Sequence, residues 1–175
     1  MASELGVQTI QHTNGTNALT IDSSGRVLTP ARPAFSVRLA TATDSNQDFT
    51  TLGDCPFDTI DFQVGNCVAI SNNVATFTAP VTGIYHIHYT LSISGATVSG
   101  HVNSYLFIDN TADSVSTDNN WRHIEDPQGG SYSMGHSDAL MQLNANQTVN
   151  PKISINVDTT IQVRRACRFF GFLVG

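Results

Sequence analysis

Two histidines separated by one residue, His86 and His88, are the pair of side chains most suggestive of chemistry in this sequence. In an extended strand both imidazoles lie on one face, a spacing that suits a metal ion such as zinc. The sequence offers no third ligand, so a threefold axis would have to supply one from another copy. We therefore expect no metal and no cofactor, and we interpret both histidines as packing and hydrogen-bonding residues at a subunit interface.

A reactive nucleophile is the second kind of chemistry to consider. Cys167 lies between Arg165 and Arg168, whose positive charges would lower a thiol pKa. It also precedes Phe169 and Phe170, a setting in which a buried thiol is the common outcome. The sequence contains no Gly-x-Ser-x-Gly elbow, no glycine-rich phosphate loop, no His-Glu-x-x-His and no Cys-x-x-Cys. We predict that the chain is not an enzyme.

The cysteine count leaves the redox state open. Cys55, Cys67 and Cys167 are an odd number, so at least one thiol is unpaired unless a bridge joins two chains. Cys55 and Cys67 could pair across a loop. In a reducing compartment, all three would instead behave as small apolar side chains in the core.

The longest polar region, residues 109–135, contains the only tryptophan. Tryptophan is enriched at the contacts that dominate binding energy, so a ligand-facing loop is one interpretation of this region. A half-buried packing role for the tryptophan is equally consistent with the sequence. The candidate loop residues are Asn119, Asn120, Trp121 and Arg122.

Composition narrows the class of partner. Charged residues make up 13% of the 175 residues and the formal net charge is -6, which disfavours binding to a phosphate backbone. No apolar run is long enough to cross a bilayer, and the first residues lack the pattern of a signal peptide. We expect a protein made in the cytoplasm that neither inserts into membranes nor binds nucleic acid.

The elements that must position these side chains are short strands. Residues 84–93 alternate, with Tyr85, Ile87 and Tyr89 on a core face and the two histidines on the other. Gly83, which follows Pro80, is expected to need a backbone angle open only to glycine. Further strands are predicted at 35–40, 60–64, 68–70, 74–77, 102–109, 139–143, 153–157, 161–165 and 169–174. Many short strands without a helical repeat predict an antiparallel sandwich or barrel.

The same stretch carries a family resemblance. Phe77, Gly83, Tyr85, Ile87 and Tyr89 follow the pattern Phe, five residues, Gly, one residue, Tyr, one residue, large apolar, one residue, aromatic. This resembles the complement-C1q globular head, one of the tumour-necrosis-factor-like jelly rolls. The flanks also resemble it, namely 33–37 as a first strand, 140–149 as a Leu-x-Leu turn and 170–173 as a last strand. The upstream half departs from the pattern, since Ile70 and Gly65 stand where an aromatic residue and Asn or Asp are usual.

The resemblance implies a homotrimeric jelly-roll head over residues 33–175. The trimer interface would include His86, His88, Phe170 and Phe172. Some heads of this family bind calcium through acidic loops, but Asp109, Asp113 and Asp118 match no cation-loop spacing, and we interpret them as solvated loop acids.

Residues 1–32 differ in composition from the rest and are too polar to build a core of their own. Residues 18–22 and 26–29 flank Ser23-Ser24-Gly25, which predicts a hairpin. Residues 18–30 resemble segments that precede C1q-like heads in tail-fibre and other virion proteins of marine bacteriophages. We interpret the segment as an attachment arm that docks through its apolar residues Leu19, Ile21, Val27 and Leu28.

These inferences converge on one expected function. The chain is expected to be a bacteriophage virion structural protein, displayed as a tail or head fibre that attaches to the host or as a capsid decoration. Its partners would be its own copies, other virion proteins through the arm, and a glycan or protein of the host surface. The alternative is a cellular C1q-like recognition or signalling protein, against which the absence of a signal peptide and of a Gly-X-Y stalk both count.

Overall fold

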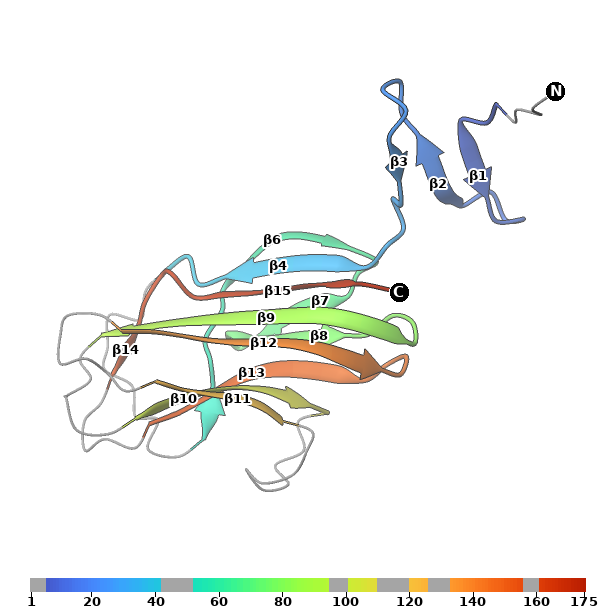
Figure 1. The fold of residues 1–175 in the computed structure, drawn as a ribbon. Helices are drawn as coiled ribbons and strands as arrows, with labels where there is room; N and C mark the ends of the chain where they lie inside the picture. Colours follow the sequence, from blue (N-terminus) through green and yellow to red (C-terminus); the bar gives the residue numbers. More distant parts are fainter. Residues whose placement is uncertain (1–5, 42–51, 95–100, 110–119, 126–132, 156–160) are drawn as a thin grey trace.

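The protein is built from strands and the turns that join them (Figure 1). The computed structural model describes residues 6–41, 52–94, 101–109, 120–125, 133–155 and 161–175, with the backbone alone at 120–125 and 133. Within these ranges no helix occurs, and so none is available there to cross a membrane. The strands are β1 (Thr9–Gln11), β2 (Asn17–Ile21), β3 (Val27–Leu28), β4 (Ala34–Arg38), β5 (Gly53–Asp54), β6 (Thr59–Val64), β7 (Val68–Ser71), β8 (Val74–Thr78), β9 (Gly83–Ser94), β10 (Val102–Ile108), β11 (Asn120–Glu125), β12 (Ser133–Leu143), β13 (Thr148–Ile155), β14 (Gln162–Val163) and β15 (Arg168–Leu173).

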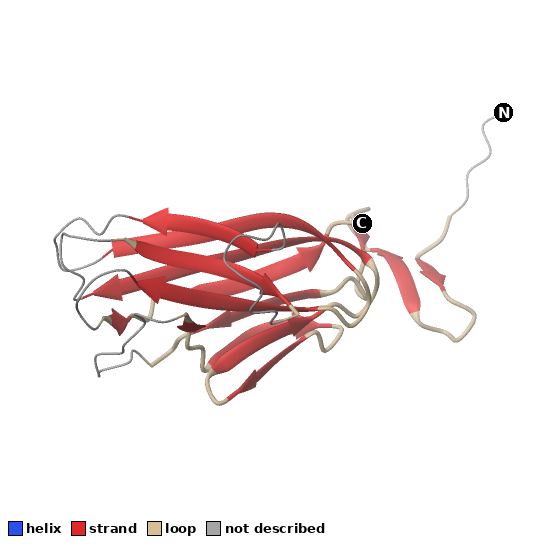
Figure 2. Ribbon diagram, turned by 90° about the horizontal axis from the view of Figure 1, so that it is seen from below, coloured by secondary structure: helices blue, strands red, loops and turns tan. Residues whose placement is uncertain are grey.

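Two antiparallel sheets pack face to face and form the head of the molecule (Figures 1 and 2). One sheet has the strand order β11-β10-β13-β8-β7, with β5 beside β13. The other has the order β12-β9-β15-β4-β6, with β14 beside β9. Strand β9 is the longest, and it pairs with β12 on one side and with β15 on the other. The predicted antiparallel sandwich is confirmed.

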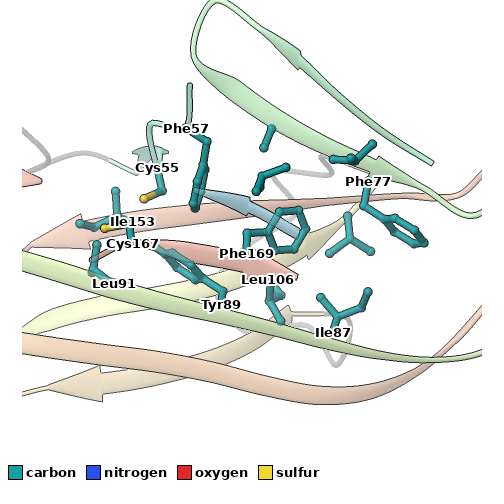
Figure 3. Packing of buried hydrophobic residues seen from close by; sticks show 14 of the residues in the cluster. Cys55, Phe57, Phe77, Ile87, Tyr89, Leu91, Leu106, Ile153, Cys167 and Phe169 are labelled. Carbon is teal, nitrogen blue, oxygen red and sulfur yellow. The ribbon is translucent and has the colours of Figure 1, made fainter. Parts of the chain in front are cut away.

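The core lies between these sheets, and β9 supplies much of it. Its inward side chains are at most 1% exposed, as the alternation in the sequence predicted. Phe35 stacks on Phe77 with ring centroids 4.9 Å apart and meets the edge of Phe169 at 4.8 Å. These rings join β4, β8 and β15 across the sandwich, and Figure 3 shows part of the cluster. Offset and edge-on aromatic pairs of this kind add to the stability gained from burial alone.

The hairpin between β7 and β8 has a two-residue turn set by its asparagines. Asn72 and Asn73 have φ angles of 49° and 62°. Two successive left-handed residues match the right-handed twist of the flanking strands, and asparagine tolerates this region better than most residues. Asn72 and Asn73 therefore lie where the backbone of this turn requires residues that tolerate a positive φ angle.

The reason given for Gly83 is corrected by the structure. Its φ angle is not in the left-handed region, where Gly15, Gly25 and Gly65 lie. A Cβ atom at Gly83 would lie 2.6 Å from Leu173 Cδ1 and 3.1 Å from Gly175 O. The glycine is needed because the C-terminal segment passes close to β9, not because of the turn.

Residues 6–32 form a small separate sheet outside the sandwich (Figure 1). Its order is β1-β2-β3, and β2 pairs with β3 across a turn at 22–26. Asp22 organises this turn, since its carboxylate accepts hydrogen bonds from the backbone N–H groups of Ser24 and Arg26. At the junction with the head, Pro33 O accepts a hydrogen bond from Leu173 N at 2.9 Å.

Two strands lie where the sequence analysis expected polar loop. Strand β12 begins at Ser133, six residues before the predicted start at 139, and its full length pairs with β9. Strand β11 covers 120–125 and pairs with β10 at the edge of its sheet. Apolar alternation, on which strand prediction depends, is weak in these two segments because most of their residues are polar.

Candidate interaction face

The sheet β12-β9-β15-β4-β6 has one side turned away from the core, and we call this side the outer face. The strand register places its residues in rows that run across the sheet. One row joins Leu140, His86 and Phe172. The next row joins Asp138, His88, Phe170, Ser36 and Phe62.

A carboxylate shared by two imidazoles lies on the outer face where edge strand β12 pairs with β9. His86 Nε2 lies 3.0 Å from Asp138 Oδ1, and His88 Nδ1 lies 2.8 Å from Asp138 Oδ2. His88 Nε2 is 2.9 Å from the hydroxyl of Thr90, which can donate to it. Two neutral imidazoles that each donate to Asp138 therefore satisfy this network, with the His88 proton on Nδ1.

The environment of Asp138 makes its contribution to stability depend on pH. Burial raises the pKa of the carboxyl, but the hydrogen bonds from His88 and His86 outweigh this effect, and the pKa lies below 3.8. A carboxyl with a lowered pKa stabilises the fold above its unfolded pKa, and this stabilisation is lost as the pH falls through the folded pKa.

We expect Asp138→Asn to destabilise the head at pH 7 and to destabilise it less at pH 2.5, because protonation of Asp138 removes the charge that the imidazoles stabilise. The difference at pH 7 should be about 1 kcal/mol or less, because the side chain is 49% exposed and solvent screens the interaction. Urea unfolding of both proteins at the two pH values measures it. A difference of the same size at pH 2.5 would contradict the stabilisation of Asp138 by the imidazoles.

Aromatic rings on β15 lie beside the two histidines of β9. The ring of His88 stacks on Phe170 with centroids 4.8 Å apart, and His86 meets the edge of Phe172 at 5.3 Å. The face then becomes more apolar, with Leu140 61%, Phe62 55% and Phe172 41% exposed. Large apolar side chains gathered on one face of a sheet mark an interaction surface more often than a bare solvent surface.

The other part of the outer face carries paired charges. Arg38 and Arg168 are cross-strand neighbours, and both contact Asp61, at 2.8 and 3.0 Å. One carboxylate thus partly neutralises two guanidinium groups. The face changes along the strands from apolar side chains through imidazoles to ion pairs, a pattern that can orient a partner.

The structure brings together the four residues predicted for an interface. His86, His88, Phe170 and Phe172 share the outer face. Whether another subunit covers them stays a prediction. The sequence analysis did not place Asp138 and Leu140 on this face. The available signal was the period of two along the strand, which puts both residues on the same side as Met134, His136 and Gln142.

The ligand-facing loop is corrected in its secondary structure. Asn120, Trp121 and Arg122 belong to strand β11 and not to a loop, while Asn119 lies outside the described residues. They are opposite Phe107, Leu106 and Tyr105 of β10. A role in ligand binding for this edge strand stays a prediction.

Of the three predicted loop acids, only Asp109 lies within the described residues; Asp113 and Asp118 do not. Its carboxylate accepts a hydrogen bond from Thr148 N at 2.8 Å and another from the side-chain amide of Gln147 at 2.9 Å. The backbone hydrogen bond from Thr148, followed by the one from Gln147, lowers the pKa of this carboxyl. Asp109 therefore serves to hold the turn at the start of β13. Within the part of the chain that is described, no group of three or more His, Cys, Asp or Glu side chains is arranged to hold a metal ion.

The arm residues divide into two kinds. Leu19 and Ile21 are partly covered within the small sheet. Val27 and Leu28 on its edge strand β3 are 62% and 46% exposed, and Ile10 is 50% exposed. The arm therefore presents an apolar surface of its own.

All three cysteines are buried and free. The pairing of Cys55 with Cys67, one of the two alternatives, is not present. Cys67 Sγ lies 3.4 Å from Val64 O and 3.7 Å from Ala34 O. The polar neighbour of Cys55 is instead Cys167.

Comparison with known proteins shows the fold. No protein-family model matches the sequence, and no curated protein matches it. The solved structure of murine APRIL at pH 5.0, a protein of the tumour-necrosis-factor family, aligns with a TM-score of 0.55 and 12% identity, over 81% of this chain and 98% of that one. The globular domain of zebrafish complement 1qA aligns with a TM-score of 0.56 and 17% identity, over 82% and 98% of the two chains. The predicted C1q- and tumour-necrosis-factor-like jelly roll is confirmed.

Proposed function

We propose that the chain is a non-enzymatic structural protein of a bacteriophage virion, with a trimeric C1q-like head displayed on the particle and an arm that docks to it. One observation carries this proposal. The chain has two separate exposed apolar surfaces, one on the outer face of the head and one on the arm. Two surfaces of this kind fit a protein that makes two different contacts.

The outer face supports self-association. Phe62, Leu140 and Phe172 would remain in water in a monomer, at a cost that grows with apolar area. Beside Leu140 and Phe172 the face carries Asp138, whose carboxylate is already hydrogen-bonded by His86 and His88. A second and third copy can therefore cover this part of the face without burying an unpaired charge.

The arm supports docking. Its edge strand β3 has only two residues and exposes Val27 and Leu28, so a strand of a partner can pair there and cover both side chains. Three arms on one trimer would bind a particle with avidity even where each contact is weak. The resemblance of residues 18–30 to segments of marine bacteriophage virion proteins assigns the partner to a virion.

Two placements of the head on the particle are consistent with this arrangement. A head held away from the particle by its arm is free to meet a host-surface glycan or protein, as in a tail or head fibre. A head that lies on the shell would instead clamp capsid subunits as a decoration protein.

Co-sedimentation with purified particles tests the proposal. The full chain should sediment with particles, whereas a chain that starts at Ala31 should remain a folded trimer in the supernatant. Binding of the shortened chain to particles would assign docking to the head. Binding of the full chain to cells but not to particles would favour the cellular recognition or signalling alternative.

A further inference from the structure

Two cysteines that are 112 positions apart meet in the core of the head. Cys55 follows β5, and Cys167 precedes β15 in the other sheet. Both side chains are fully buried, and their thiol groups are close enough to interact with each other. Figure 3 shows the two sulfurs directed toward each other. The contact thus bridges segments that are attached to opposite sheets.

The two thiols have unequal surroundings. Cys167 Sγ lies 3.2 Å from Ser92 N, which donates to it. The hydrogen bond from Cys55, joined by the one from Ser92, lowers the pKa of Cys167 against the opposing effect of burial. Burial, followed by the contact with Cys167, raises the pKa of Cys55. Of the two thiols, Cys167 is therefore the one that gives up its proton more readily.

Core side chains surround the pair. Phe57, Leu91 and Ile153 lie around the two sulfurs in the core (Figure 3). The buried hydroxyl of Tyr89 lies against Cys55 and has no nitrogen or oxygen partner among the described residues.

Cys55 and Cys167 both lie outside the strands, in connecting segments. Their backbone makes a few hydrogen bonds, from Cys55 N to Pro151 O and from Leu39 N to Cys167 O, and no continuous ladder. A disulfide requires the two sulfurs to approach to about 2.05 Å. Cys67 offers a contrast, because its polar neighbours are the carbonyl groups of Ala34 and Val64 and not a thiol.

We propose that Cys55 and Cys167 form a reactive dithiol that a hydroperoxide oxidises to a disulfide, which locks the two sheets of the head together. The Cys167 thiol first releases its proton to solvent, and the thiolate then attacks one oxygen of hydrogen peroxide. The O–O bond breaks to give a sulfenic acid and hydroxide, and the hydroxide takes up the released proton to become water. The Cys55 sulfur then attacks the sulfenic sulfur, so that the S–S bond forms, the S–O bond breaks and a second water leaves with the Cys55 proton. The two thiols lose two electrons in total, and one peroxide becomes two waters.

This inference does not depend on the proposed function, because the pair lies in the core and not on either exposed apolar surface. A cross-link that closes a loop of this length is expected to raise the melting temperature by on the order of 10 °C. Treatment of the oxidised head with dithiothreitol should reduce the disulfide and return the melting temperature to its original value.

Mass spectrometry of the full chain treated with hydrogen peroxide tests the proposal. After denaturation in N-ethylmaleimide, one thiol should be labelled, and a non-reducing digest should contain a peptide pair linked through Cys55 and Cys167. The same treatment of Cys67→Ser should give the same linked pair with no labelled thiol. Cys55→Ser should give neither the link nor the rise in melting temperature.

Three results would overturn the proposal. One is labelling of all three thiols after peroxide treatment of the wild-type chain. Another is a disulfide that includes Cys67. The third is oxidation of Cys167 to a sulfinic acid without a cross-link. Each is measured on the wild-type protein, so none depends on whether a variant folds.

Discussion

Replacing Gly171 by alanine is expected to lower the free energy of unfolding by about 3 kcal/mol or more. Gly171 lies on the inward side of β15, and a Cβ atom there would be 2.5 Å from Ile87 Cδ1 and 2.7 Å from His86 O. The side chain of Ile87 can rotate to relieve the first contact. The carbonyl of His86 belongs to the backbone of β9 and cannot move without disturbing the β9–β15 ladder. Urea unfolding of the two proteins at pH 7 measures the effect.

Gly175→Ala is the matched control, since it makes the same chemical change at a glycine with no heavy atom within 4 Å of the added Cβ. Its free energy of unfolding should match that of the wild type within about 0.5 kcal/mol. If Gly171→Ala unfolds at the same urea concentration as the wild type, β15 packs on β9 less tightly than the structure shows.

The strands were predictable because their signal is local. Inward and outward side chains alternate along β9 with period two, and every inward residue from Tyr85 to Ile93 is buried as the sequence predicted. The asparagine turn at 72–73 was equally readable, since its φ angles depend on those residues alone. The family pattern then gave the fold class.

The centre of the candidate site was only half predictable, because strand register is not local. His86 and His88 share a face through their own spacing, and this could be read from the sequence. Asp138 joins them only because β12 pairs with β9 in one register, opposite His88. A shift of one residue would turn Asp138 toward the core.

Long-range packing also explains the wrong reason given for Gly83 and the pairing of cysteines that the sequence left open. The sequence suggested a turn requirement at Gly83, whereas Leu173, ninety residues later, is the side chain that excludes a Cβ atom there. Cys55 and Cys67 looked like a pair because they are close in sequence. The folded chain places Cys55 beside Cys167 instead.

The double substitution Leu140→Glu with Phe172→Glu is expected to convert the proposed trimer into monomers. The two positions lie in one cross-strand row with His86, so two carboxylates would gather on the apolar part of the outer face. Burial of unpaired charges against another subunit costs several kcal/mol for each charge, which exceeds what a modest apolar contact supplies. The fold of each subunit should survive, because the side chains are already 61% and 41% exposed.

Light scattering after gel filtration measures the mass, which should be three times the 18.8 kDa chain for the wild type and a single chain for the variant. Val27→Glu with Leu28→Glu in the arm is the matched control, since it adds the same charges at two other exposed apolar residues. The arm variant should remain trimeric and should lose particle binding. A monomeric wild-type protein, or a double variant of the outer face that stays trimeric, would contradict assembly through this face. Loss of the trimer in the arm variant would show instead that residues 1–32 hold the subunits together, since the outer face would then be too weak to do so alone.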